Sequence, residues 1–188
     1  TAQNTYTYNS KGTKTIKLEA STAFCTDSAA MDIDVILPIP TPGFVSDVND
    51  GCVALEVAFE DTSAWAENVE WFFGDGRSSK QRNPIHTYKL PGTYKVSQRV
   101  VNERGQSFVT VEDYITVYAL PYVDFDPTPK QVFLPDADVT FNNLSFNSVK
   151  YEWYKNDTFF SKDTVPFYRF TEEGRYDIKL IGYSKEGC

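Results

Sequence analysis

The strongest constraint on this chain is an internal repeat. The triplet 57–59, Val-Ala-Phe, returns as Val-Thr-Phe at 139–141, which is 82 positions later. The same offset links a wider set of residues, namely Ser63/Ser145, Trp71/Trp153, Pro84/Pro166, Tyr88/Phe170, Gly92/Gly174 and Tyr94/Tyr176. A constant offset over this span predicts two copies of one folding unit with no net insertion between the matched positions.

The N-terminal stretch reads as a partial third copy. Its matches are Tyr8 with Tyr88 and Gly12 with Gly92 at an offset of 80, and the segment 33–35 with 115–117 at 82. We therefore expect residues 1–37 to be the C-terminal half of a domain, 38–118 a complete domain, and 119–188 a degenerate domain that lacks its last strand. Prolines mark the expected junctions, because proline interrupts a strand ladder and stiffens a linker; they are Pro38, Pro40, Pro42 and Pro121.

The hydrophobic pattern has the period of a β-strand. Over residues 53–60, apolar Val and Leu side chains and Phe59 alternate with Ala54, Glu56, Ala58 and Glu60. Period two indicates a strand with one buried face. Short strands bounded by turn residues at this spacing predict an all-β chain of tandem immunoglobulin-like antiparallel β-sandwiches in a head-to-tail array.

Composition removes several function classes. The chain has 188 residues, with 26 acidic and 18 basic side chains and a net charge of -8. This balance argues against nucleic acid and against an anionic membrane as partners. A stretch of about 18 apolar residues is absent from the sequence, so we expect no membrane insertion. The chain opens without a signal segment, which fits a mature or cut fragment.

The residues available for catalysis or metal binding are few. There is one histidine, and a zinc site would have to use Cys25, Cys52 and Cys188, which include no close pair. Structural zinc sites usually contain such a pair. We expect no enzymatic activity, no cofactor and no metal site from this segment.

The middle copy resembles a known family. Residues 69–76 read VEWFFGDG, 83–88 read NPIHTY and 92–96 read GTYKV. This pattern resembles the PKD domain, an immunoglobulin-like β-sandwich. Its motif residues here are Trp71, Gly74, Asp75, Gly76, Pro84, His86, Tyr88, Gly92 and Tyr94. The third copy keeps Trp153 but replaces the FGDG and HTY stretches, so it resembles a degenerate PKD-like domain.

Several motif residues allow two interpretations. Asp75 is either a turn residue beside two glycines or a calcium ligand, and turn chemistry is the commoner reason for such a triplet. His86 is either structural or catalytic, and its replacement by Tyr6 and Tyr168 in the other copies favours a structural role. Trp65 either stacks on a sugar ring or partner surface from an exposed loop, or folds back over the end of the sandwich.

Acidic residues near the expected domain ends also have two interpretations. They form either a solvated rim or a cation site that bridges domains, and charge runs are usually solvated. These residues are Asp47, Asp50, Asp124, Asp126, Asp136 and Asp138.

The resemblance implies an extracellular, non-catalytic role. A short loop cysteine followed by a Pro-x-Pro junction is similar to repeats of large Bacteroidetes gliding-motility adhesins exported by type IX secretion. That similarity implies the stalk or filament of a cell-surface adhesin, outside the outer membrane or secreted. Its partners would be neighbouring repeats, surface polysaccharide, or other cell-surface and secretion proteins. The alternatives are an accessory binding or spacer module of a secreted hydrolase, and a structural component of a surface assembly.

The cysteines then raise the question of pairing. The middle copy has Cys52 before its second strand, and the third copy has Cys188 in its last hairpin loop. In an immunoglobulin-like fold these positions lie at opposite ends of a domain. A head-to-tail array would therefore bring them together, and we predict a Cys52–Cys188 disulfide across the joint, with Cys25 bonded to a cysteine further upstream. A Cys25–Cys52 bond, or three reduced cysteines, remains open at this point.

Overall fold

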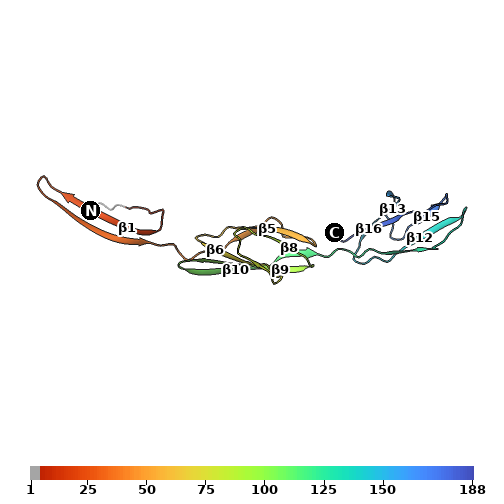
Figure 1. Cartoon of the computed structure of the whole chain (residues 1–188), viewed down its shortest axis with the longest axis horizontal. Coiled ribbons are helices and arrows are strands. Elements are labelled where there is room, and N and C mark those ends of the chain that lie inside the picture. The colour runs from red at the N-terminus through yellow and green to blue at the C-terminus, as the bar shows by residue number, and fades with distance from the viewer. Residues whose placement is uncertain (1–4) are drawn as a thin grey trace.

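The structure is a computed structural model that describes residues 5–188, and every regular element in that range is a strand. Three bodies follow one another along a single long axis (Figure 1). The first is a lone hairpin of β1 (Gly12–Ser21) and β2 (Thr26–Val35), paired from Gly12 opposite Val35 to Ser21 opposite Thr26. The other two bodies are sandwiches. The chain is therefore all-β, with immunoglobulin-like sandwiches arranged head to tail.

The middle sandwich consists of two antiparallel sheets with one parallel edge strand. One sheet has the order β4 (Asp50–Cys52), β10 (Gly105–Tyr118), β9 (Gly92–Asn102), β6 (Asn68–Phe72) and β7 (Ser78–Ser79). The other has the order β3 (Phe44–Ser46), β5 (Leu55–Asp61) and β8 (Ile85–Tyr88). The short strand β4 runs parallel to the end of β10, which carries the chain out of this sandwich.

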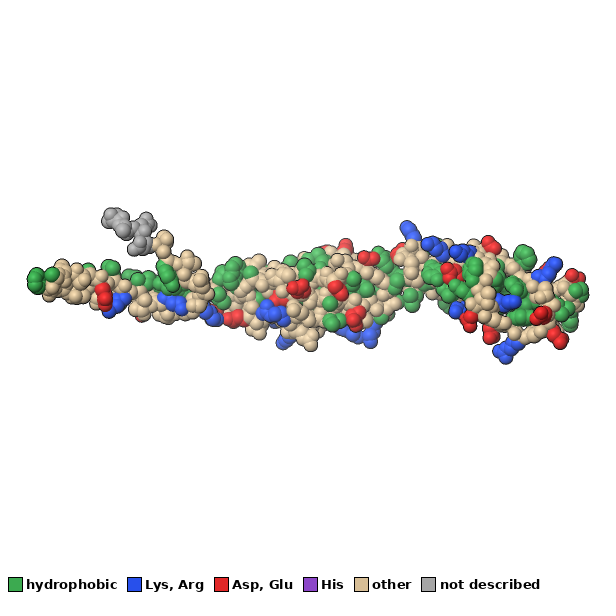
Figure 2. Space-filling model, turned by 90° about the horizontal axis from the view of Figure 1, so that it is seen from above, with side chains coloured by type: hydrophobic (Ala, Val, Ile, Leu, Met, Phe, Trp, Pro, Cys, Tyr) green, Lys and Arg blue, Asp and Glu red, His purple; other side chains and the backbone are tan. Residues whose placement is uncertain are grey.

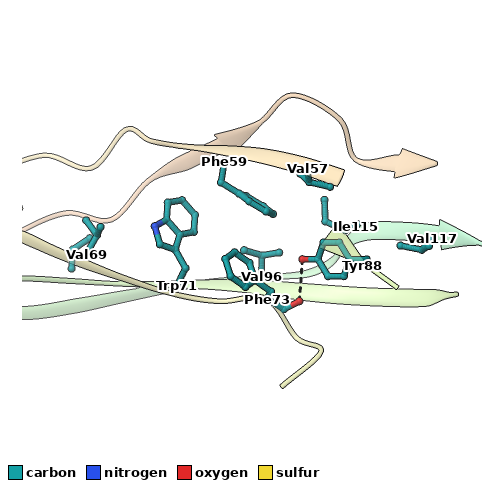
Figure 3. Packing of buried hydrophobic residues seen from close by; sticks show 10 residues of the cluster. Val57, Phe59, Val69, Trp71, Phe73, Tyr88, Val96, Ile115 and Val117 are labelled. Atoms are coloured by element: carbon teal, nitrogen blue, oxygen red, sulfur yellow. Dashed lines mark hydrogen bonds between the residues drawn. The ribbon is translucent and has the colours of Figure 1, made fainter. Parts of the chain in front are cut away.

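The core of the middle sandwich is built by the alternation seen in the sequence. Figure 3 shows Trp71 and Phe73 projecting from one sheet toward Phe59 and Val57 of the other. Trp71 has no exposed surface, and its indole Nε1–H donates to the carbonyl of Gln81 at 2.9 Å. The buried set comprises Val57, Phe59, Val69, Trp71, Phe73, Tyr88, Val96, Val100, Ile115 and Val117.

The C-terminal sandwich repeats this plan 82 residues later. Its sheets have the orders β11 (Phe125–Thr128), β12 (Ala137–Asn143), β15 (Phe167–Phe170) and β14 (Thr158–Ser161), β13 (Lys150–Lys155), β16 (Ile178–Tyr183). The bounds of β12 and β15 are those of β5 and β8 moved by 82 positions. The indole of Trp153 repeats the bond of Trp71 by donating to the carbonyl of Asp163 at 2.9 Å. The sequence repeat is thus matched at the level of single hydrogen bonds.

The C-terminal sandwich can be compared with the middle one only over the strands that its residues supply. The positions that correspond to β10 would begin at residue 187, and the sequence runs to Cys188. Residues that include Phe125, Val139 and Ile178 line a groove of about 690 Å³ on this sandwich. Its buried cluster comprises Val139, Phe141 and Trp153.

Candidate functional sites

The glycine-rich turn of the middle sandwich spans residues 73–77. Phe73 N–H donates to the carbonyl of Arg77 at 3.1 Å, and Asp75 Oδ1 accepts from Arg77 N–H at 3.0 Å. Gly74 and Gly76 have φ values of 81° and 88°, in the left-handed region that favours glycine. A Cβ on Gly74 would lie 2.4 Å from the carbonyl oxygen of Lys95. The motif therefore meets a backbone requirement at both glycines.

Asp75 and His86 are brought together by this turn. His86 Nε2 lies 2.9 Å from Asp75 Oδ2, and the imidazole stacks on the ring of Phe73 with centroids 4.0 Å apart. His86 belongs to β8 and Asp75 follows β6, so the contact joins the two sheets. Both oxygens of Asp75 have partners within the fold, and His86 is buried. These contacts favour the structural interpretation of both residues.

Tyr88 lies two residues after His86 on the same buried face of β8. Its hydroxyl donates to the carbonyl of Phe73 at 3.1 Å, and the residue has no exposed surface (Figure 3). Burial raises the pKa of the Tyr88 phenol well above its ordinary value of 10.0, and the nearby charge of Asp75 raises it further. Burial in the core thus favours the neutral form of the Tyr88 phenol.

The structure leaves Trp65 half-exposed, at 51 %, so it does not fold back as a cover over the end of the sandwich. The reason is a left-handed backbone, with φ of 59°, fixed by Asn102 Nδ2, which donates to the Trp65 carbonyl at 2.8 Å. Asn147, 82 positions later, has φ of 60°. Asparagine tolerates this conformation well, so Asn147 was the available signal for it in the sequence.

The joint between the sandwiches is closed by a disulfide between Cys52 and Cys188. Their Cα atoms lie 5.6 Å apart, within the range that disulfides require. Cys52 precedes β5, as expected, but it belongs to a short strand of its own, β4, and lies opposite Tyr118, the last residue of β10. Cys188 is held in the turn 184–188, where its N–H donates to Ser184 Oγ at 3.2 Å. Cys25 is exposed and carries a free thiol at the tip of the β1–β2 hairpin.

A polar network outside the motif residues lies inside the middle sandwich. Gln98 is fully buried, accepts from Gly43 N–H at 3.0 Å, and donates to Asp61 Oδ1 at 2.8 Å. The other Asp61 oxygen accepts from Arg82 at 2.6 Å. The signal in the sequence was a glutamine at an inward position of β9, between Val96 and Val100. A buried amide with a partner at both its oxygen and its nitrogen helps to fix the packing of the two sheets.

Four of the six acidic residues at the domain ends are engaged with cations or backbone groups, namely Asp47, Asp124, Asp126 and Asp138. Asp138 forms a bidentate pair with Arg169, and Asp126 lies 2.9 Å from Lys130 Nζ. Across residues 5–188, no three His, Cys, Asp or Glu side chains gather closely enough to hold a metal ion. The same part of the chain has no helix that is long and apolar enough to cross a membrane.

Comparison with known proteins identifies the middle sandwich. Residues 37–117 match the family model described as PKD domain, from just before β3 to the last strand, β10. The chain contains a PKD domain. The turn 73–77, the Asp75–His86 contact and Tyr88 are thus parts of this PKD domain.

Two collagenases of Bacillus cereus are similar to parts of the chain. Collagenase ColQ1 of strain Q1 is 44 % identical over 48 residues, which cover 23 % of this chain and 5 % of the collagenase. Collagenase ColA of another strain is 31 % identical over 104 residues, covering 50 % of this chain and 10 % of the collagenase. The chain thus spans a tenth or less of the length of either collagenase.

Among solved structures, the PKD1 domain of Vibrio anguillarum Epp is 24 % identical. The match has a TM-score of 0.37 and covers 43 % of this chain and 98 % of that domain.

Proposed function

We propose that this chain is a non-catalytic extracellular spacer, a segment of the stalk of a cell-surface adhesin that acts in gliding motility and surface adhesion. The observation that carries the proposal is the head-to-tail arrangement of sandwiches with a disulfide across one joint (Figure 1). A covalent tie at a joint serves a protein whose domains must keep their relative orientation. Disulfides of this kind persist in oxidising, extracytoplasmic compartments, which supports export, here by type IX secretion.

The partners we propose follow from the same arrangement. Neighbouring repeats of the same chain would meet at joints like the one that Cys52 and Cys188 close, and the distal partners would be surface polysaccharide or other surface and secretion proteins. The net charge of -8 disfavours nucleic acid. The third sandwich would be a degenerate PKD-like repeat, since it shares strand positions with the PKD domain but departs from its turn motif.

Immunolabelling of intact cells tests the proposal. Antibodies raised against the purified chain should label the outer surface of unpermeabilised cells of the source organism, and deleting the segment in frame should reduce attachment and movement on surfaces. Label confined to the culture medium, together with unchanged attachment, would contradict it. The purified chain should also fail to hydrolyse polysaccharides or peptides.

The second candidate is an accessory binding or spacer module of a secreted hydrolase. The similarity to the two Bacillus cereus collagenases favours it. This candidate predicts that the purified chain sediments with insoluble collagen or polysaccharide, and that a catalytic domain belongs to the same polypeptide. Sequencing the complete gene separates the two candidates, since the adhesin predicts many further repeats and the hydrolase predicts a catalytic domain beside a few of them.

A further inference from the structure

A basic pocket of about 430 Å³ lies on the C-terminal sandwich. Its walls come from the start of β13, the segment after β14, the end of β16 and the turn 184–188. Three lysines line it, Lys150, Lys162 and Lys185, together with Tyr183 and Glu152. Figure 2 shows basic side chains gathered at the end of this sandwich that faces the joint.

The charge in this pocket opposes the charge of the chain. Three lysines and one glutamate line it, while the whole chain carries -8. Among residues 5–188, none of the three lysines has an ion-pair partner, although Lys162 Nζ lies 5.8 Å from the centre of the Phe159 ring. Glu152 Oε2 already accepts from the hydroxyls of Tyr154 at 2.7 Å and Tyr183 at 3.3 Å. Like charges held at one site repel each other until a counter-charge arrives.

The middle sandwich shows that the fold does not require two of these lysines, Lys150 and Lys185. The positions 82 residues earlier hold Asn68, Lys80 and Glu103, and Val101 stands in place of Tyr183. Glu103 there pairs with Lys11 at 3.4 Å. The same strand plan thus carries a mixed, partly paired surface in one sandwich and an unpaired basic one in the other.

We propose that this pocket binds a carboxylate- or sulfate-bearing sugar unit of an acidic polysaccharide. Three ammonium donors supply the counter-charge, and the Tyr183 ring, which is half-buried in the wall, offers an aromatic face to a pyranose ring. The volume is in the range of roughly 300–1,000 Å³ that small-ligand sites occupy. The choice of a polysaccharide over other polyanions rests on the proposed extracellular function.

The disulfide supports one wall of this pocket. Lys185 lies in the turn that ends at Cys188, and backbone bonds between Ser184 and Cys188 close that turn. Reduction of the disulfide should therefore weaken binding without removing any charge from the pocket.

Titration of the isotope-labelled chain with trigalacturonate, followed by amide NMR, tests the proposal. We expect saturable shifts at Lys150, Lys162, Tyr183 and Lys185. The triple variant Lys150→Gln, Lys162→Gln, Lys185→Gln should lose at least about tenfold in association constant, because exposed charges act together at low ionic strength. The control variant Lys14→Gln, Lys80→Gln, Lys89→Gln removes the same charge elsewhere, including the counterpart of Lys162, and should change it less than about twofold. Melting curves that match the parent chain establish that both variants fold.

Each alternative result has a defined meaning. An equal loss of association constant in the two triple variants would show that binding depends only on net charge, and would overturn the proposal. Equal affinity for a neutral trisaccharide, or stronger binding to single-stranded DNA or to phosphatidylglycerol vesicles, would overturn it as well. Failure to bind sugar while antibodies still label the cell surface would leave the stalk proposal intact, and the reverse pattern would reject the stalk and keep the pocket.

Discussion

At the scale of single residues, the two tryptophans of the middle sandwich have opposite environments. Trp71 is fully buried between the sheets, whereas Trp65 is 51 % exposed. Trp71→Ala should lower the free energy of unfolding of this sandwich by roughly 3–5 kcal/mol, the usual cost of removing a core aromatic. Trp65→Ala should cost about 0.5 kcal/mol or less, as is normal at the surface. Urea denaturation followed by circular dichroism measures both, and equal losses would contradict the placement.

Tyr88 should make the middle sandwich sensitive to alkali. Below pH 10 the phenol is neutral in both the folded and the unfolded chain, so its contribution to stability is complete. Above that value the unfolded chain ionises first, because the pKa of the folded phenol is raised by burial. Stability should therefore fall with rising pH, by about 1.4 kcal/mol per unit from this group.

Tyr88→Phe provides the comparison for that effect. The variant loses the hydrogen bond to the Phe73 carbonyl, at a cost of about 1 kcal/mol near neutral pH. Its stability should then decline less steeply above pH 10 than that of the parent chain. Parallel declines in unfolding experiments between pH 9 and 12 would show that Tyr88 does not control the alkaline transition.

The burial of single residues could be predicted from the sequence where the alternation of apolar residues and the internal repeat agree, as at Trp71 and Trp153. Burial or exposure could not be predicted where it depends on a contact between residues far apart in the sequence. The exposure of Trp65 depends on Asn102, 37 positions away, and the burial of Gln98 depends on Asp61 and Gly43. The cluster of lysines in the basic pocket likewise requires three segments to meet in space.

At the scale of elements, the β6–β7 turn offers a matched pair of glycines. The Cβ added by Gly76→Ala would have no atom within 4 Å. This variant should lower the free energy of unfolding by about 1–2 kcal/mol, the penalty of a left-handed φ. Gly74→Ala should cost at least about twice as much, because its Cβ would lie 2.4 Å from the Lys95 carbonyl. Thermal melting of the two variants measures the difference, and a smaller loss for Gly74→Ala would refute this account of the turn.

Strand positions were the part of the fold most accessible to sequence reasoning. The offset of 82 carries β5 onto β12 and β8 onto β15 because the intervening loops have equal lengths in the two sandwiches. The short strand β4 was missed, since a three-residue segment of Asp, Gly and Cys has no strand pattern of its own. Its pairing is imposed by the neighbouring edge of β10, which periodicity along the chain cannot reveal.

At the scale of the whole molecule, the disulfide should fix the orientation of the sandwiches. In the double variant Cys52→Ser, Cys188→Ser, the linker alone would connect them. Small-angle X-ray scattering should then show a shorter maximum dimension and a broader distance distribution. In the chain-entropy model the bond also contributes about 5 kcal/mol, because it closes a loop with a sequence separation of 136. Cys25→Ser is the control, and scattering curves that coincide for all three proteins would show that the linker is rigid without the bond.

The position of the same bond also determines how tension would travel through the chain. Pulled at its first and last residues, the polypeptide transmits force along the shortest covalent route, which enters Cys52, crosses the two sulfurs and leaves at Cys188. Residues 53–187 lie off that route and bear no tension while the disulfide is intact. Fully extended, this segment would add about 480 Å, at roughly 3.5 Å per residue over a separation of 136 residues. The load then acts on the short strands β3 and β4, which pair with β5 and β10. The rest of both sandwiches lies outside the loaded path and stays folded.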